Sequence, residues 1–278
     1  MGASSDRRAR VTDAEGFSGG DEARAALVNV IVVIADNKYR LGRALSEWAV
    51  GAPTLENAVG CAAIAQEELG HSRALYPLLN ELNREGAPTP LEHGGERDRY
   101  YAVSYLDAAP PTWPDMVCGL LLVDTAMLTL IGSLVDSTYA NLRRRLARMP
   151  DEEHFHMEFA EGRVRELVND PERLRTFSQQ VDRLLPEMLC WFGPSRERGA
   201  EVLVAEGHLT RNGDQMRQAY LLRVAPLLLE VGVRLPVRWD LATRTWEYKE
   251  LPWETWDPLR RRLGDPPAED GKSEGIDG

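Results

Sequence analysis

Hydrophobic residues recur at spacings of three and four along most of this chain, which is the period of an amphipathic helix. The first such stripe, between residues 21 and 50, consists of Leu27, Val30, Ile31, Ile34, Leu41 and Leu45. Gly51, Ala52 and Pro53 end this helix, and Thr54 is a side-chain cap for a second helix that continues to about Leu82. The pattern therefore begins with a helical hairpin.

A long polar connection over residues 83–111 is typical of a crossover between two helical hairpins. A third helix is predicted from Pro114, a fourth from Ala140, and further helices over residues 171–192 and 214–231. Residues 237–253 alternate aromatic and charged side chains and predict a short hairpin. Residues 1–20 and 264–278 have no hydrophobic period and predict disordered tails, so one domain is expected over residues 21–263.

Two places compete for the turn before the fourth helix. A turn at Pro150 would put Glu153 in the first turn of that helix, far along the axis from Asp124. We therefore expect the turn near residues 137–139, which contain neither glycine nor proline. Pro150 is then a kink inside the fourth helix.

Residues 116–135 are almost entirely apolar and are about long enough to cross a membrane. Asp124 lies in the middle of this segment, where a carboxylate costs roughly 2.5–3.5 kcal/mol on insertion scales. No cluster of basic residues precedes the segment. We therefore expect no membrane span but a central helix that is buried on all sides and turns its one acid to a polar site.

Charge and cysteine usage narrow the class of protein. The formal net charge is −11, which disfavours nucleic acid as a partner because phosphate binding needs a basic surface. Cys61, Cys118 and Cys190 are far apart and odd in number, which predicts buried, reduced thiols. The N-terminal residues contain no apolar signal segment. A cytoplasmic protein is expected.

The pattern Glu-Glu-x-x-His occurs twice, at residues 67–71 and 152–156. Residues three apart share a helix face, so Glu68 and His71 can reach one metal ion together, and so can Glu153 and His156. Two such helices facing each other, with a carboxylate from each of two further helices, form the dimetal site of ferritin-like bundles. The sequence therefore predicts an all-α, ferritin-like four-helix bundle with a crossover and additional C-terminal helices.

Asp36 and Asp124 are the candidates for the two remaining carboxylates, since each lies on a predicted helix that precedes one of the motifs. Four carboxylates balance the charge of two iron(II) ions, and oxygen and nitrogen ligands without thiolate favour iron or manganese. We expect two iron ions, with manganese or a mixed pair as the alternative. The predicted metal ligands are Asp36, Glu68, His71, Asp124, Glu153 and His156, the two glutamates being bridging candidates.

Other interpretations of these residues compete. Asp36 could be a solvated acid, because polar residues follow it. Glu67 and Glu152 are rotated by about 100° from the predicted ligands and are expected outside the ligand shell. Asp151 and His154 form an overlapping pair with the same spacing, although the second motif as written matches the first one better.

Several segments resemble the phenylacetic acid catabolic proteins, which are ferritin-like subunits of phenylacetyl-CoA epoxidase. Residues 120–162, the APT and QEELGH segments, WFGP at residues 191–194 and residues 231–256 are similar to the catalytic subunit. The segment ADNKYRLGRALSEW at residues 35–48 is more similar to the structural sister subunit, which has lost its metal ligands. The resemblance covers about residues 21–263.

This resemblance implies a bacterial multicomponent monooxygenase, in which a reductase with flavin and an iron–sulfur centre supplies electrons to a di-iron site. That site activates O2 and adds one oxygen atom to an aromatic ring held as its CoA thioester. We accordingly expect an O2-dependent di-iron monooxygenase that hydroxylates or epoxidises an organic substrate, with phenylacetyl-CoA as one candidate. A non-catalytic structural subunit and a ferritin-like iron- or peroxide-handling protein are the alternatives.

Two departures separate the chain from the catalytic subunit. The first-helix ligand of the family is a glutamate, whereas Asp36 would serve here with a shift of two residues. The lysines associated with CoA phosphates are replaced by Ile64 in the first region, and Glu201 and Glu206 occupy the second. These acids disfavour a phosphate-rich ligand, although arginines between residues 211 and 223 could substitute for the lysines.

The resembled subunits work in complexes, and this chain combines features of both types. A homodimer with two-fold symmetry is the simplest expectation, because one self-complementary surface suffices. A heteromer with a sister subunit is the rival. Trp48, Tyr76 and Leu79 are candidate interface residues, although a core edge that a loop covers explains them equally well.

Overall fold

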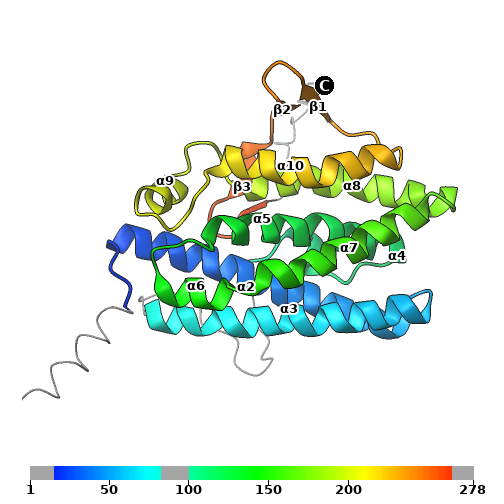
Figure 1. Cartoon of the computed structure of the whole chain (residues 1–278). Helices are drawn as coiled ribbons and strands as arrows, with labels where there is room; N and C mark the ends of the chain where they lie inside the picture. Colours follow the sequence, from blue (N-terminus) through cyan, green and yellow to red (C-terminus); the bar gives the residue numbers. More distant parts are fainter. Residues whose placement is uncertain (1–15, 83–99, 265–278) are drawn as a thin grey trace, which may run out of the picture.

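A computed structural model describes residues 16–82 and 100–264 of the chain. These residues form a helical bundle, followed by two small antiparallel strand pairs (Figure 1). The predicted fold class, an all-α ferritin-like bundle, is thereby confirmed. The tails predicted at residues 1–20 and 264–278 fall mostly outside the described residues, as does most of the polar connection. The predicted domain limits stay a prediction.

Helices α2 (Asp21–Gly51) and α3 (Leu55–Leu82) form the predicted hairpin. Thr54 caps α3 as expected, because its hydroxyl accepts a hydrogen bond of 3.2 Å from the backbone N–H of Asn57. Every residue from Val30 to Lys38 is buried. The middle of α2 is therefore enclosed on all sides, which is more than its apolar stripe alone predicts.

The apolar segment forms a continuous helical rod, which consists of α4 (Trp113–Gly119), a π-helical turn η2 (Leu120–Asp124) and α5 (Thr125–Leu134). It is long and apolar enough to cross a membrane, yet 94% of its most apolar window is buried inside the bundle. Such burial is the arrangement of a core helix, as predicted. A π-turn adds one residue to a helical turn and is frequent at functional sites. This one ends at Asp124.

The predicted fourth helix is divided into α6 (Ala140–Leu146) and α7 (Met149–Leu167). The expectation of one helix kinked at Pro150 is therefore wrong. The chain leaves the helix at Ala147 and Arg148, and Pro150 lies in the first turn of α7. Proline is tolerated there, because the first N–H groups of a helix have no intrahelical partner.

The turn before α6 lies at residues 137–139, as predicted, although no glycine or proline forms it. Contacts with a distant loop hold it instead. Ser137 Oγ lies 3.0 Å from His208 Nδ1, and the backbone N–H of Thr138 donates to the carbonyl of Gly207 at 3.0 Å. Contacts with residues distant in the sequence, and not local turn residues, therefore determine this turn.

The C-terminal part covers the bundle on the side away from α3 (Figure 1). Its helices are α8 (Pro171–Trp191), α9 (Arg198–Ala205) and α10 (Gly213–Glu230). The hairpin β1 (Val237–Asp240) and β2 (Thr245–Tyr248) and the pair β3 (Trp256–Asp257) and β4 (Arg262–Leu263) follow. The 3₁₀ turns are η1 (Ser104–Asp107) and η3 (Trp253–Thr255). The two longer helices and the first hairpin are confirmed, whereas the short α9 has no clear signal in the hydrophobic pattern.

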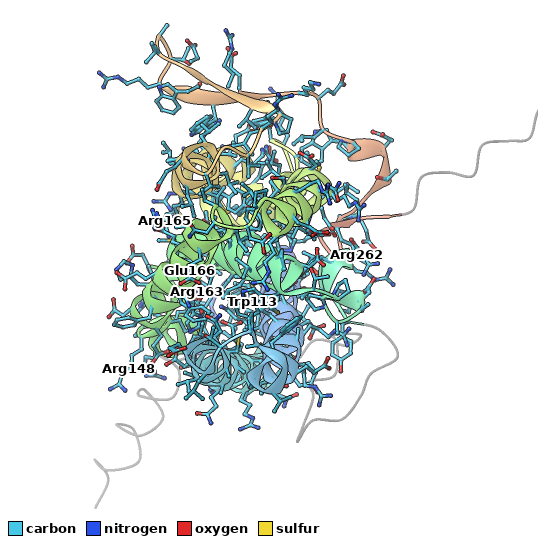
Figure 2. All side chains as sticks on the ribbon, turned by 90° about the vertical axis from the view of Figure 1, so that its right-hand side faces the viewer. Trp113, Arg148, Arg163, Arg165, Glu166 and Arg262 are labelled. Atoms are coloured by element: carbon cyan, nitrogen blue, oxygen red, sulfur yellow. The ribbon has the colours of Figure 1, made fainter. Side chains whose placement is uncertain are left out.

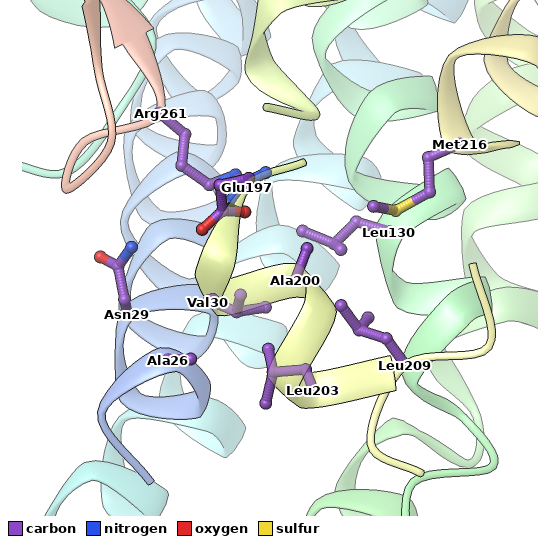
Figure 3. A pocket seen from close by; sticks show the side chains of 11 residues that line it. Ala26, Asn29, Val30, Leu130, Glu197, Ala200, Leu203, Leu209, Met216 and Arg261 are labelled. Carbon is purple, nitrogen blue, oxygen red and sulfur yellow. Dashed lines mark hydrogen bonds and ion pairs between the residues drawn. The ribbon is translucent and has the colours of Figure 1, made fainter. Parts of the chain in front are cut away.

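A small cavity of about 20 Å³ lies between α2, α5, α9 and α10 (Figure 3). Leu130, Leu203 and Met216 supply apolar wall, and Glu197 forms an ion pair with Arg261, with 3.1 Å between Oε2 and Nη1. The space holds about one water molecule. It is therefore too small to be a substrate pocket.

The three cysteines Cys61, Cys118 and Cys190 are free and buried, as predicted. Burial raises the pKa of Cys61 and of Cys190 to about 12. The thiolate is the reactive form of cysteine, so these side chains serve as core packing.

Two of the three candidate interface residues are buried within the chain itself. Tyr76 is 4% exposed and Leu79 is 2% exposed, so these two residues belong to the core and do not form a subunit interface. Trp48 packs on Trp113 with 5.5 Å between the ring centroids. Figure 2 views the bundle along its helices, from the right-hand end of Figure 1, and shows Trp113 near the middle of this view.

Candidate metal centre

Three helical segments bring acidic and imidazole side chains together inside the bundle. Glu68 comes from α3, Asp124 from the end of the π-turn, and Glu153 and His156 from α7. One ligand atom from each lies within 4.8 Å of the others. His71 of α3 lies beside them, with 3.0 Å between its Nδ1 and Glu153 Oε1. The structure thus brings together five of the six residues predicted as metal ligands.

The ammonium of Lys38, from α2, lies between the three carboxylates of this cluster. Its Nζ donates to Glu68 Oε1 and to Asp124 Oδ1 at 2.7 Å each, and also to Glu153 Oε1. The Lys38 side chain is 0% exposed. An unpaired buried ammonium is costly, so these charge-assisted hydrogen bonds are what allow Lys38 to be charged in the core.

The charged groups of the cluster shift one another's pKa values. Burial opposes the charged form of Lys38, but Asp124, Glu153 and Glu68 outweigh it and raise the pKa of this amine above its ordinary value. Burial and the neighbouring glutamates raise the pKa of Asp124 to about 7. Burial disfavours the imidazolium of His156, but hydrogen bonds with the carboxylates raise its pKa above the ordinary value.

A glutamate of the opposite motif holds each histidine from behind. His71 Nε2 lies 2.7 Å from Glu152 Oε2, and His156 Nε2 lies 2.6 Å from Glu67 Oε2. The other ring nitrogens face the cluster, and His156 Nδ1 is 3.1 Å from Asp124 Oδ2. A carboxylate on the remote nitrogen fixes the orientation of an imidazole and makes its other nitrogen a better metal ligand. The first glutamate of each motif therefore supports the histidine of the other motif.

We expect Glu67→Ala and Glu152→Ala each to weaken metal binding by roughly 10- to 100-fold, because each variant frees one imidazole to rotate. Titration of the metal-free protein with Mn(II) or Fe(II) measures this. Glu158→Ala is the matched control, since Glu158 is an exposed glutamate on α7. Affinities equal to that of the control would show that the two glutamates do not support the histidines.

Asp36 does not join the cluster. Its Oδ1 accepts a hydrogen bond of 2.8 Å from the hydroxyl of Tyr76, and its Oδ2 accepts one of 2.7 Å from the backbone N–H of Tyr101. The amide of Asn37 contacts the same segment, since its Oδ1 accepts from the N–H of Val103 at 3.1 Å. Asp36 and Asn37 therefore fasten α2 to α3 and to the segment that precedes η1.

We expect Asp36→Ala to leave the metal content unchanged and to lower the stability by about 1–3 kcal/mol, because it leaves buried hydrogen-bond donors without their acceptor. Metal analysis and thermal unfolding of the same sample measure both effects. A variant that folds normally but loses its metal would restore Asp36 as a ligand.

The residues of the cluster fit a metal ion. Among the described residues, Glu68 Oε2 and Glu153 Oε2 are buried oxygens without a hydrogen-bond partner. Buried polar atoms are rarely left in this state, and a metal ion would satisfy them. Oxygen and nitrogen donors without thiolate suit iron or manganese. A buried Glu, Asp and His cluster that could bind a metal is thus present, while the identity of the metal stays a prediction.

The functional residue that the sequence analysis missed is Lys38. A signal exists, because the chain has three lysines, Lys38, Lys249 and Lys272, and Lys38 alone follows a long apolar run. A lysine at that place, one helical turn after buried valines and isoleucines, indicates a buried acidic partner. The supporting roles of Glu67 and Glu152 have no local signal, because they depend on how the two helices face each other.

A comparison with protein families gives one match. The model of the family described as phenylacetic acid catabolic protein matches residues 15–261. No curated protein matches the chain. The matched region includes Lys38 and every residue of the cluster.

Proposed function

This chain belongs to the phenylacetic acid catabolic protein family, and we propose that it is the metal-binding subunit of an O2-dependent monooxygenase. The reaction is the hydroxylation or epoxidation of an organic substrate. One observation carries the proposal: the two histidines and three buried carboxylates converge, and each imidazole is supported by a glutamate of the other motif. Such support is typical of a site that binds a metal.

The residues that would hold the metal are Glu68, Asp124, Glu153 and His156, with His71 beside them. A bound iron or manganese ion would supply the redox chemistry with O2, using electrons that come from outside the chain. The protein's own contribution is to orient the donors and to keep bulk water away, since these side chains are at most 6% exposed. The sequence analysis expects two iron ions.

We expect the organic substrate to bind in a surface groove that is lined by residues of α5, α7 and α10. It has a volume of about 480 Å³, within the usual range for small-molecule sites. Leu128, one helical turn after Asp124, lines it together with Phe155 and Met157 of α7 and Arg223 of α10. Pro150, Asp151 and His154 complete the lining. The apolar side chains suit an aryl or acyl group, and Arg223 offers a cation to an anionic carrier such as a CoA thioester.

The proposed reaction needs electrons from outside the chain, so a reductase is a required partner. A second copy of this chain is the simplest further partner, and a sister subunit, which membership of the family suggests, is the rival. A cytoplasmic location follows from the same proposal.

Light scattering of the purified chain decides how it assembles. We expect twice the mass of one chain at micromolar concentrations, because a single self-complementary surface suffices for a dimer. A mass near that of one chain would refute self-pairing and point to a sister subunit.

The proposal is tested by mixing the metal-loaded, chemically reduced protein with O2 in a stopped-flow instrument, with and without phenylacetyl-CoA. We expect rapid O2 consumption that accelerates with the substrate, and a product heavier by one oxygen atom in mass spectrometry. Arg223→Gln should raise the substrate concentration needed for half-maximal acceleration, while it leaves the reaction without substrate unchanged. Metal oxidation without an organic product would instead favour an iron- or peroxide-handling protein.

A second candidate function is favoured by Lys38. An ammonium that binds three buried carboxylates compensates part of their charge without any metal, as a lysine in a non-catalytic structural subunit would. This candidate predicts that the reduced protein does not react with O2 after incubation with iron or manganese. The same stopped-flow measurement therefore separates the two functions.

A further inference from the structure

We infer that this centre holds a single divalent metal ion beside Lys38, and not a pair of ions. The inference rests on the proposed function, because it concerns the number of metal ions in the same site. Three features of the cluster support it: the oxygen atoms that Lys38 occupies, the charge, and the missing carboxylate on α2.

Lys38 occupies one side of the carboxylate cluster. Its Nζ takes one oxygen from each acid, namely Glu68 Oε1, Asp124 Oδ1 and Glu153 Oε1. In a dimetal site both oxygens of a bridging glutamate bind metal. Here one oxygen of each glutamate is already bound to an ammonium, so a bridge between two metal ions would have to displace Lys38 from a core in which it is 0% exposed.

Each of the three carboxylates keeps one oxygen atom that Lys38 does not bind. Asp124 Oδ2 lies 3.1 Å from His156 Nδ1, while Lys38 binds the other oxygen, Oδ1. Glu68 Oε2 and Glu153 Oε2 are buried and, within the described part of the chain, lack a hydrogen-bond partner. Three oxygens and the histidine nitrogens are a sufficient ligand set for one iron(II) or manganese(II) ion.

The net charge of the cluster also indicates a single metal ion. Glu68, Asp124 and Glu153 contribute three negative charges, and the ammonium of Lys38 cancels one of them. The remaining two buried charges neutralise one divalent ion. Glu152 and Glu67, behind the histidines, are 41% and 44% exposed, so water solvates their charges and they are not counted with the buried groups. A second divalent ion would leave the buried site with an excess of two positive charges, which is strongly unfavourable in a medium of low dielectric constant.

Helix α2 supplies no carboxylate to a second metal position. Its acidic residues are Asp21, Glu22, Asp36 and Glu47. The first two lie in the first turn of the helix, Glu47 is exposed near its end, and Asp36 binds Tyr76 and the backbone of Tyr101. Lys38 is the residue of α2 that reaches the cluster, so the position of the fourth carboxylate holds a positive charge.

The test is a metal count on the full-length protein. The protein is stripped of metal, loaded with excess Mn(II) under anaerobic conditions and desalted, and its manganese is measured per chain together with its electron paramagnetic resonance spectrum. We expect about one ion per chain with the spectrum of an isolated Mn(II). Two ions per chain with an exchange-coupled spectrum would overturn the inference and leave the proposed function standing. No bound metal would overturn both.

A charge-reversed variant tests whether Lys38 sets this count. Lys38→Glu supplies the missing carboxylate, and we expect the bound manganese to double and its spectrum to become exchange-coupled. Lys249→Glu is the matched control, because Lys249 is exposed, and it should stay at the wild-type count. A folded Lys38→Glu protein that still binds one ion would contradict the role of Lys38. If this variant does not fold, the count and the spectrum of the wild-type protein still decide the inference.

Discussion

The double variant Glu68→Ala/Glu153→Ala is expected to lose its metal ion and its reaction with O2. The two substitutions remove two of the three buried carboxylates and leave Asp124 paired with Lys38, a combination without net charge. This neutral pair has little attraction for a divalent cation in the core. We expect metal affinity to fall by at least ~100-fold, the upper end of what loss of a supporting residue costs.

Metal analysis after loading with iron or manganese measures this loss, and O2 uptake by the reduced protein measures its consequence. Glu56→Ala/Glu158→Ala is the control, since it removes one exposed glutamate from each of the same two helices. The control should keep both properties of the wild-type protein. Unchanged metal content in Glu68→Ala/Glu153→Ala would show that the metal, if any, binds elsewhere.

Lys38→Met is expected to destabilise the metal-free protein strongly. Methionine fills a similar volume but leaves Glu68, Asp124 and Glu153 without the ammonium that compensates their charge. Breaking a buried ion pair from one side costs about 3–5 kcal/mol. In a domain of this size such a loss lowers the melting temperature by roughly 10 °C.

Thermal unfolding of metal-free Lys38→Met and Lys249→Met checks this prediction. The exposed Lys249 should be replaceable within about 0.5 kcal/mol. Added Mn(II) should recover part of the stability of Lys38→Met, because the metal supplies the positive charge that the lysine no longer provides. A melting temperature equal to that of the wild-type protein would mean that Lys38 does not stabilise the cluster.

The helices and the five clustered residues can be predicted from the sequence, because both rest on short-range periodicity. The duplicated motif places Glu68 and His71, and likewise Glu153 and His156, on one helix face whatever the rest of the fold does. Asp124 stands out for the related reason that a charge inside an apolar helix needs a partner. These inferences need only one helix at a time.

Asp36 shows where such reasoning ends. Counting residues along α2 predicts the height of a side chain in the bundle but not the direction in which it points. Lys38 follows Asp36 by two residues, which rotates it by about 200° around the helix. The two side chains therefore leave α2 on nearly opposite sides, and Lys38 reaches the cluster while Asp36 reaches Tyr76 and Tyr101.

Two further features depend on contacts between distant parts of the chain. The π-turn at residues 120–124 adds a residue to the helical register just before Asp124, and no local motif announces it. The division between α6 and α7 puts Glu153 early in α7, where the sequence analysis considered it too far from Asp124. A break in a helix changes the path of the chain. Counting residues along a continuous helix axis therefore does not predict the distance between Asp124 and Glu153.

Anomalous X-ray scattering from crystals of the iron-loaded protein tests most directly whether this cluster is a metal centre. We expect one anomalous peak at the iron edge, bounded by Glu68, Asp124, Glu153 and His156, with the ammonium of Lys38 beside it. A map without a peak at this place, in crystals that contain iron in the solution and Lys38 still bound to its three carboxylates, would contradict the metal centre and the oxygenase function that depends on it.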